Sequence, residues 1–317
     1  MRVLVTGGAG CIGSHLVEAL LARGDAVRVL DDLSTGNVAN LADVRVCVNL
    51  IQGSITVAAT VEQAVAGCDI VFHLAALPSV TKSIENPLAA HEIGATGTLL
   101  VLDAARRAKV RRVVYAASSS AYGDQPGDVR RETDALLPLS PYAAAKLAGE
   151  HYCQCCTAVY GLETVQLRFF NVFGPRQDAK SPYSGVISLF SAAMAHGKAP
   201  TIYGDGLQTR DFVYVDDVVQ ALIRAAEAPP AVGNVYNIGT GQSVTILDLV
   251  MHLNDLLGST LQPIHAPPRA GDVRHSLADI ALARRDLGYA PTVSFRDGLA
   301  RTLHAATPRN RCAHPGT

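Results

Sequence analysis

A tyrosine and a lysine four positions apart are the residues of this sequence that most directly suggest chemistry. Tyr142 and Lys146 lie in the run Ser-Pro-Tyr-Ala-Ala-Ala-Lys, which is predicted to open a helix. Residues four apart share one face of a helix, so both side chains can act on the same ligand. A free tyrosine has a pKa of about 10, and making it a base near pH 7 costs roughly 4 kcal/mol. A nearby ammonium group and a cationic cofactor in a dry site could supply this energy.

Three consecutive serines, residues 118–120, follow a strand predicted over residues 112–117. At the carboxyl end of a central strand they would point into the crevice where open α/β sheets bind ligands. We therefore predict a catalytic site made of Ser118, Tyr142 and Lys146. The alternative is that the tyrosine and the lysine share a helix surface by chance.

A glycine-rich turn between a strand and a helix predicts a second site beside the first. Residues 3–5 form a short β-branched run typical of a buried parallel strand, and a helical pattern begins near Ile12. Between them, Gly7 permits a tight turn, Gly10 lets a diphosphate approach the backbone, and Gly13 lets the helix pack closely. The helix N-terminus then faces the anion, which predicts a dinucleotide site. A merely structural glycine turn is the alternative.

An acidic residue stands where such sites hold the adenosine ribose. Asp31 ends the strand predicted over residues 26–30, and the polar loop 32–37 would lie under the adenosine. The carboxylate would repel a 2′-phosphate, and the next basic residue is Arg45, so NAD is favoured over NADP. The predicted NAD contacts are Gly7, Gly10, Cys11, Ile12, Gly13, Asp31, Asp32, Ser34, Thr35, Gly36, Ser54, Ile55, Leu74, Ala75, Ala76, Tyr142 and Lys146.

The elements that must position these residues alternate between strands and helices. This alternation predicts an α/β fold, a Rossmann-type doubly wound parallel sheet with a smaller C-terminal substrate-binding lobe. The small residues that end the fourth strand suit a backbone lying against the cofactor, although tight strand–helix packing would also explain them. Further strands are predicted at 46–53, 69–74 and 112–117, and helices at 14–23, 57–66, 88–107 and 143–158.

The second half of the chain is less regular and predicts the smaller lobe. We expect residues 1–172 to form the NAD-binding domain, residues 173–307 mainly the substrate lobe, and residues 308–317 a disordered tail. In this half, helices are predicted near 184–196, 215–228, 245–257 and 279–287, with a short strand at 201–203 and a strand at about 233–239 that returns to the sheet.

Composition restricts the partners and the compartment. The 317 residues include 27 basic and 28 acidic side chains, which leaves no electrostatic basis for binding nucleic acid or an anionic membrane. No apolar run approaches the roughly 20 residues of a membrane span. Met1 leads directly into the first predicted strand, and the seven cysteines are an odd number, so we expect a cytoplasmic protein with reduced thiols.

A metal site is not expected. The cluster that invites one comprises His151, Cys153, Cys155 and Cys156. All four lie on one continuous predicted helix, with no distant pair at zinc-like spacing, which favours ordinary helix packing.

Several motifs together resemble the extended short-chain dehydrogenase/reductase family. The resemblance is closest to nucleotide-sugar 4-epimerases, including bacterial UDP-N-acetylglucosamine 4-epimerases and UDP-galactose 4-epimerases, and it covers residues 1 to about 305. The motifs are Thr6-Gly-Gly-Ala-Gly-Cys-Ile-Gly13, Ser118-Ser-Ser-Ala-Tyr-Gly, Tyr142-x-x-x-Lys146, Leu167-Arg-Phe-Phe-Asn-Val-Phe-Gly-Pro175, Arg210-Asp-Phe-Val-Tyr-Val215 and Gly271-Asp-Val-Arg-His-Ser-Leu-Ala-Asp279.

The resemblance implies a role for each matching residue. Tyr142 would be the general base, and Ser118 would meet the sugar 4-hydroxyl. Lys146 would bind the ribose of NAD and lower the pKa of Tyr142. Asn171, Arg210 and Arg269 would hold the diphosphate, Tyr203 the uracil and Asp272 the uridine ribose, while Ser276 would border the C2 substituent. The full predicted substrate set is Ser118, Ser119, Ser120, Asn171, Val186, Tyr203, Arg210, Arg269, Asp272 and Ser276.

The activity that the resemblance implies is interconversion of UDP-N-acetylglucosamine and UDP-N-acetylgalactosamine, and also of UDP-glucose and UDP-galactose, through a 4-keto intermediate. It implies tightly bound NAD that is regenerated in each cycle. It also implies a homodimer formed by the helices near 95–107 and 143–158. Alternatives are a UDP-glucuronate 4-epimerase, a 4-keto-sugar reductase or dehydratase, and an NAD-sensing protein without turnover. Related dehydratases place acidic residues just after the catalytic hydroxyl, where this chain has Ser119 and Ser120.

Three positions depart from the family pattern. Ser54 stands where an aspartate usually meets the adenine amino group, so looser adenine contacts are expected. Gly94 replaces a common asparagine, and Ser188 stands where a proline is usual.

Overall fold

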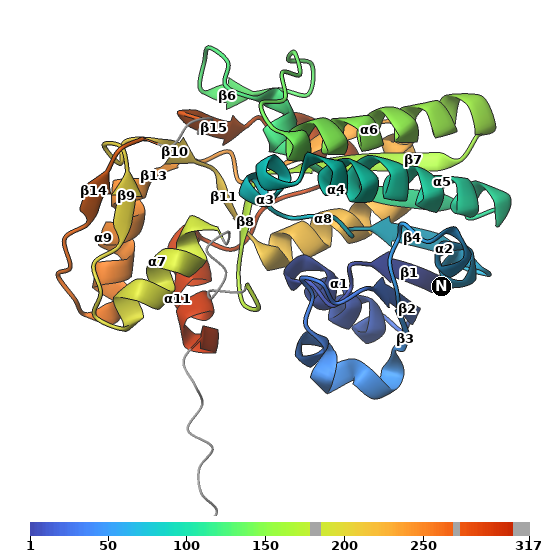
Figure 1. Cartoon of the computed structure of the whole chain (residues 1–317), viewed down its shortest axis with the longest axis horizontal. Coiled ribbons are helices and arrows are strands. Elements are labelled where there is room, and N and C mark those ends of the chain that lie inside the picture. Colours follow the sequence, from blue (N-terminus) through green and yellow to red (C-terminus); the bar gives the residue numbers. More distant parts are fainter. Residues whose placement is uncertain (178–184, 269–272, 307–317) are drawn as a thin grey trace, which may run out of the picture.

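Seven parallel strands form the central sheet (Figure 1). This computed structural model describes residues 1–177, 185–268 and 273–306. The strand order β12-β7-β5-β4-β1-β2-β3 runs outward in both directions from the pair β1 and β4, which confirms the doubly wound sheet. The strands are β1 (Arg2–Thr6), β2 (Ala26–Asp31), β3 (Asn49–Gln52), β4 (Ile70–His73), β5 (Arg112–Ser118), β7 (Glu163–Phe169) and β12 (Val235–Ile238).

Helices cover both faces of this sheet. Alternate side chains of a buried strand enter opposite cores, so Val3 and Val5 of β1 lie in one core and Leu4 in the other. The first core takes in α1 (Cys11–Ala22), α8 (Val215–Glu227) and α10 (Ala281–Leu287), and the second takes in α2 (Ala58–Val65), α5 (Thr98–Arg107) and α6 (Pro141–Tyr160). No helix in the described ranges is both long and apolar enough to cross a bilayer.

Two helices predicted for the C-terminal lobe belong to the sheet layer instead. The helices expected at 215–228 and 279–287 are α8 and α10, whose Leu222 and Leu287 are buried in the first sheet core. An amphipathic pattern shows that a helix face is buried but not which surface covers it. The third strand was also predicted too early, because Val38–Cys47 is a helical segment and β3 begins at Asn49.

The helix predicted over residues 88–107 is divided by a π-helical turn. It consists of α4 (Pro87–His91), the turn Glu92–Gly97 and α5, and it follows a short helix, α3 (Val80–Glu85), that was not predicted. A Cβ atom on Gly94 would lie 2.7 Å from the Ala145 Cβ atom. The glycine found in place of the expected asparagine therefore allows this segment to pack closely on α6.

A smaller lobe with its own apolar core lies beside the sheet (Figure 1). Phe173, Phe212 and Tyr214 lie in that core, among α7 (Val186–Ala195), α9 (Ile246–Leu257) and α11 (Phe295–Ala306). The sequence predicted α7 and α9 but not α11, and the predicted tail at 308–317 lies outside the described residues. The lobe's strands are β8 (Asn171–Phe173) with β11 (Phe212–Tyr214), β9 (Thr201–Tyr203) with β14 (Ile264–Ala266), and the sheet of β13 (Val244–Thr245), β10 (Thr209–Arg210), β15 (His275–Ala278) and β6 (Val129–Arg130).

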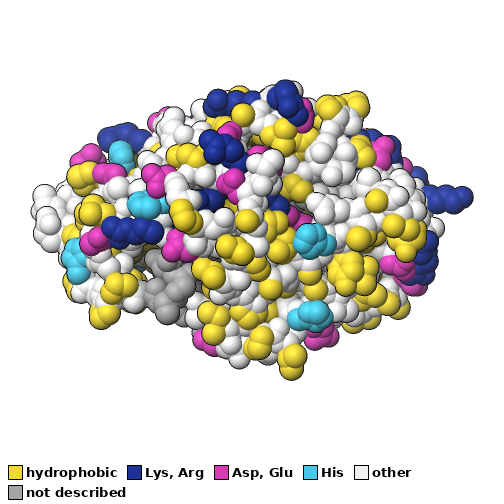
Figure 2. Space-filling view, turned by 90° about the horizontal axis from the view of Figure 1, so that it is seen from above, with side chains coloured by type: hydrophobic (Ala, Val, Ile, Leu, Met, Phe, Trp, Pro, Cys, Tyr) yellow, Lys and Arg dark blue, Asp and Glu magenta, His cyan; other side chains and the backbone are white. Residues whose placement is uncertain are grey.

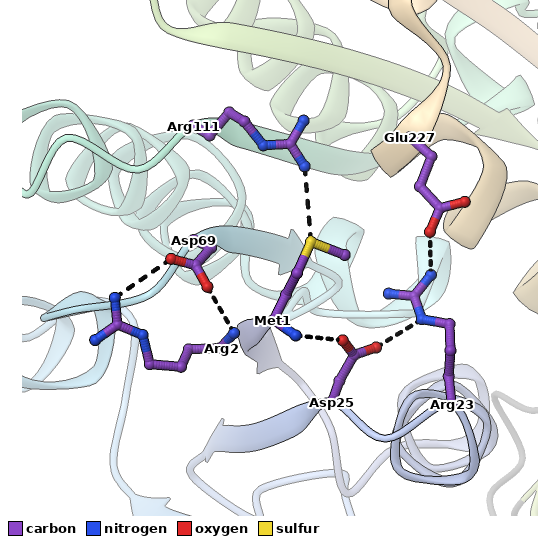
Figure 3. Close-up of polar contacts among 7 residues, drawn as sticks. All are labelled: Met1, Arg2, Arg23, Asp25, Asp69, Arg111 and Glu227. Atoms are coloured by element: carbon purple, nitrogen blue, oxygen red, sulfur yellow. Dashed lines mark hydrogen bonds and ion pairs between the residues drawn. The ribbon is translucent and has the colours of Figure 1, made fainter.

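Ion pairs stabilise the sheet at the amino ends of its parallel strands (Figure 3). The amino group of Met1 lies 2.8 Å from Asp25 Oδ1, and Arg23 Nε donates to Asp25 Oδ2 at 2.7 Å. Arg23 also pairs with Glu227 at the end of α8. These contacts join β1, the turn before β2 and α8 at the edge of the sheet opposite to its carboxyl ends.

A buried ion pair fixes α6 on the sheet. Glu150 of α6 and Arg168 of β7 make three hydrogen bonds of 2.7 to 3.1 Å, and their side chains are only 1% and 3% exposed. Arg168 also donates to the Tyr122 hydroxyl at 2.9 Å, which donates to Asn237 Oδ1 of β12 at 2.7 Å. The helix that carries Tyr142 is thus tied to two neighbouring strands.

Glu150→Gln is expected to destabilise the fold strongly, because it leaves the Arg168 guanidinium buried without a counter-charge. Breaking a buried pair in this way costs about 3–5 kcal/mol, measurable by urea unfolding. The matched control is Glu62→Gln, which removes a pair with Arg107 in which both side chains are 49% exposed, and its effect should be far smaller. Equal losses in the two variants would contradict this role of the buried pair.

Candidate functional site

A cleft of about 1020 Å³ lies along the carboxyl edge of the parallel strands. It extends from the glycine loop after β1, past Asp31 at the end of β2, to Ser118 at the end of β5 and to Tyr142 and Lys146 on α6. This is where the strand order reverses, the usual ligand position in such sheets. Every residue predicted to contact NAD lines this one cleft.

The glycine loop has the shape of a diphosphate cradle. Gly7 has φ of +70°, and a Cβ atom there would lie 2.8 Å from the Ala75 nitrogen. A Cβ atom on Gly13 would overlap the Gly7 carbonyl oxygen. Gly10 precedes α1 and provides no side-chain cap, so the first N–H groups of the helix face the cleft. These residues fit a dinucleotide whose diphosphate meets bare backbone.

Asp31 is held rigidly beside that cradle. Its Oδ2 atom accepts from the Ala9 N–H and its Oδ1 atom from the Leu33 N–H, each at 2.9 Å. Burial raises the pKa of the carboxyl group, while these two backbone donors oppose the rise. A Cβ atom on Gly36 would lie 2.8 Å from Asp31 Oδ1, so glycine keeps the approach to the carboxylate open. Each carboxylate oxygen can accept a further bond from a ribose hydroxyl.

Asp31→Ala is expected to weaken NAD binding by about 10- to 100-fold, since hydrogen bonds to a charged group contribute roughly 1.5–3 kcal/mol. NADP binding should improve relative to NAD, because the repulsion of a 2′-phosphate disappears with the carboxylate. Equilibrium titrations with both dinucleotides measure the ratio, and Asp43→Ala, at an exposed position, controls for lost charge. An unchanged NAD to NADP ratio would remove Asp31 from the site.

The serine run arranges one hydroxyl group toward the tyrosine. Ser118 Oγ accepts from the Ser120 N–H at 3.2 Å and from the Ser120 hydroxyl at 2.9 Å. With both acceptor positions occupied, the Ser118 proton is available to Tyr142. Burial raises the pKa of Tyr142, and the hydrogen bond from Ser118 opposes the rise. Ser118 lines the cleft, whereas Ser119 and Ser120 are not among its described lining residues.

Lys146 is buried beneath Tyr142 on the same face of α6. Its Nζ atom donates to the Ala116 carbonyl at 2.7 Å and lies 5.0 Å from the centre of the Tyr115 ring. Burial lowers the pKa of this lysine to about 8. Burial holds the pKa of Tyr142 above its ordinary value, so its acidification by Lys146 together with the positive charge of NAD stays a prediction.

The affinity for NAD is expected to fall as pH rises through about 8, where Lys146 loses its proton. In the unfolded chain the lysine returns to its ordinary pKa of 10.5, so between these values the unfolded state binds more protons. The free energy of unfolding of the apoprotein should therefore rise with pH in that window. Titrations of NAD across this range test the first effect, with Lys146→Met as the control whose weaker binding should not depend on pH there. If the NAD affinity of Lys146→Met also fell with pH in this range, Lys146 would not be the group whose titration controls NAD binding.

The residues predicted for substrate lie mostly outside the lined cleft. Asn171 is in its lining, and its neighbour in the register of β8 and β11 is Phe212. Arg210 of β10 pairs in register with Ser276 of β15, so these two predicted residues are adjacent. Those not in the described lining are Ser119, Ser120, Val186, Tyr203, Arg210 and Ser276, while Arg269 and Asp272 lie outside the described residues.

Other cleft residues were not predicted. Arg176 and Gln177 line the cleft directly after the Gly-Pro that ends the quoted motif, and Arg176 pairs with Glu18 of α1 at 2.5 Å. The motif itself, read two residues further, could have indicated both. Ser188 donates to Gln177 Oε1 at 2.7 Å, which gives the serine found in place of the usual proline a positioning role.

The part of the chain that the structure describes contains no candidate metal-binding cluster. There, no three side chains of His, Cys, Asp or Glu come together as ligands. His151, Cys153, Cys155 and Cys156 lie along α6, with Cys153 and Cys156 buried.

Comparison with known proteins relates this fold and cleft to one family. Residues 3–239 match the model of the NAD dependent epimerase/dehydratase family. UDP-glucose 4-epimerase of Mycolicibacterium smegmatis is 40% identical over 310 residues, covering 96% of this chain and 97% of that protein.

Two solved structures are similarly close. UDP-glucose 4-epimerase of Thermotoga maritima with UDP-glucose has a TM-score of 0.92 and 38% identity, covering 96% of this chain and 98% of that one. UDP-N-acetylglucosamine 4-epimerase of Methanobrevibacter ruminantium, in complex with UDP-N-acetylmuramic acid, has a TM-score of 0.92 and 38% identity, covering 96% and 97%.

Proposed function

This chain belongs to the NAD-dependent epimerase/dehydratase family, and we propose that it interconverts UDP-N-acetylglucosamine and UDP-N-acetylgalactosamine, with UDP-glucose and UDP-galactose as further substrates. Its cofactor is NAD. The observation that carries the proposal is the convergence of Ser118, Tyr142 and Lys146 on the cleft that also contains the glycine cradle. The similarity to 4-epimerases over nearly the whole chain supports the substrate class.

The chain's own groups perform the proton chemistry. NAD held by the glycine cradle and Asp31 would supply hydride acceptor and donor chemistry at the sugar C4. Tyr142 removes the 4-hydroxyl proton, helped by Lys146, while Ser118 orients the sugar oxygen. The 4-keto sugar then turns about its diphosphate so that its opposite face meets the cofactor, and Tyr142 returns the proton.

Dehydration is disfavoured by the groups available. Elimination of water from the sugar requires a carboxylic acid or base near C5 and C6. Among the described residues that line the cleft, the only carboxylates are Asp31 and Asp32, both at the end of β2 beside the predicted ribose position. Ser119 and Ser120 cannot take this role, which favours epimerisation.

We propose that the enzyme is a cytoplasmic homodimer formed by the helices along α4, α5 and α6. Leu88, Val159 and Tyr160 are exposed apolar residues on these elements. α4 and α5 both pack against α6, so the three helices can present one surface.

The face shown in Figure 2 mixes basic and acidic side chains without a large patch of one sign, which fits a partner other than nucleic acid or an anionic membrane.

Tyr142→Phe is expected to keep folding and NAD binding while lowering epimerase turnover by about 10²–10⁴-fold, the usual contribution of a positioned acid or base. Turnover is measured by NMR of the anomeric protons after addition of UDP-N-acetylglucosamine and NAD. Tyr152→Phe, at an exposed position of the same helix, is the matched control. Turnover of Tyr142→Phe near that of the control would exclude Tyr142 as the base.

Ser276→Tyr is expected to select against the acetylated sugar. We propose that this small residue, in register with Arg210, leaves room for the C2 acetamido group, which an aromatic ring would fill. The value of kcat/KM should fall roughly 10- to 200-fold for UDP-N-acetylglucosamine and little for UDP-glucose. Ser276→Ala, which adds no volume, should leave the ratio unchanged. Equal effects of Ser276→Tyr on both sugars would contradict a gating role.

A further inference from the structure

Asp211 carries a buried carboxylate that four hydrogen bonds surround. It is 0% exposed, and its Oδ1 atom accepts from both the Thr240 N–H and the Thr240 hydroxyl at 2.7 Å. Its Oδ2 atom accepts from the Gly241 N–H at 3.0 Å and the Ala278 N–H at 3.2 Å. A Cβ atom on Gly239 would lie 2.6 Å from Oδ2, so the carboxylate packs against bare backbone. Within the described residues its bonds thus come from the loop after β12 and from β15.

The backbone of Asp211 reaches two further segments. Its N–H donates to the Ser276 carbonyl at 2.8 Å, and its carbonyl accepts from the Asn171 N–H at 3.0 Å. Arg210 precedes it directly in the chain. Asn171, Arg210 and Ser276, which the family resemblance assigns to the diphosphate and the C2 substituent, therefore meet at this one aspartate.

Asp211 also occupies the junction between two sheets. The strand before it, β10, has only two residues and pairs with β13 and β15, whereas the strand after it, β11, pairs with β8. A strand of two residues makes few backbone hydrogen bonds to its neighbours. The strand alone therefore does not fix the direction of its side chains. Asp211 follows Arg210 directly as the single residue between β10 and β11, so a rotation of the Asp211 backbone would move Arg210 as well.

We propose that Asp211 is a positioning residue for UDP-sugar: its carboxylate cluster sets the orientation of Arg210 and the placement of Asn171 and Ser276 for the nucleotide diphosphate and the sugar. This inference rests on the proposed UDP-sugar function. It assigns Asp211 no contact with the substrate and no part in NAD binding.

The chain offers a matched control at Asp217 of α8. This carboxylate is 2% exposed and accepts from the Thr292 N–H at 2.9 Å, the Thr292 hydroxyl at 3.0 Å and the Val293 N–H at 3.2 Å. It has the same kind of donors as Asp211. Its partners include none of Asn171, Arg210 and Ser276.

The test compares Asp211→Asn with Asp217→Asn by calorimetric titration of UDP and, separately, of NAD. In each variant the NH₂ group of the new asparagine would face backbone and threonine donors that the carboxylate accepted from, so hydrogen bonds are lost and both variants should have a lower melting temperature. Only Asp211→Asn should weaken UDP binding, by about 10- to 100-fold, the loss expected when one hydrogen bond to a charged group is broken. NAD affinity should stay unchanged, and in turnover KM should rise more than kcat falls.

Thr240→Val and Thr292→Val repeat the comparison with a milder change, so a misfolded Asp211→Asn leaves the test intact. Thr240→Val should weaken UDP binding in the same direction and Thr292→Val should not. A loss of UDP affinity that is equal in each matched pair overturns the positioning role while leaving the proposed function in place. Failure of the wild-type protein to bind UDP overturns the proposed function and this inference with it.

Discussion

The buried ion pair between Glu150 and Arg168 is the interaction on which the geometry of the site depends most. Tyr142, Lys146 and Glu150 follow one another at intervals of four on α6, so fixing the last sets the position of the other two. Arg168 lies opposite Ala117 of β5 in the register of β5 and β7, one residue before Ser118. The bond from Lys146 to the Ala116 carbonyl adds a second link to the same strand. The pair thus holds the helix that carries Tyr142 and Lys146 at a fixed height above the strand that ends at Ser118.

A second buried polar chain holds the cofactor side of the cleft. Thr98 donates to the Gly94 carbonyl at 2.7 Å, so it must accept from His73 Nε2 at 3.0 Å, and this assigns the proton of the imidazole to Nε2. His73 Nδ1 then accepts from the Thr6 hydroxyl at 2.7 Å, and Thr6 accepts from the Ala75 N–H at 3.2 Å. Burial, with Lys146 nearby, lowers the pKa of His73 to about 3, so the ring stays neutral. These hydrogen bonds connect Gly94 of the π-helical turn to Ala75, which lines the cleft.

How far the sequence predicts this protein depends on how local each feature is. The glycine loop, Asp31 and the Tyr142–Lys146 pair are defined by short-range spacing, and the strands and helices around them have clear periods. The sheet and the NAD side of the cleft could therefore be predicted, but Arg176 and Gln177 were missed. The substrate side depends on strands of two or three residues that have no period and on partners far apart in the chain. Asp211 lay inside a quoted motif, yet only the folded chain shows that it joins Asn171, Thr240 and Ser276.

We propose that NAD in this one cleft would accept a hydride from the sugar C4 and return it to the opposite face of the same carbon. The most direct measurement uses UDP-glucose with deuterium at C4 of the glucose, incubated with the purified protein and NAD, and follows the product by NMR. We expect UDP-galactose that retains the deuterium at C4, with no accumulation of NADH. Protium from water at C4 of the product, or NADH formed in proportion to substrate consumed, would contradict it.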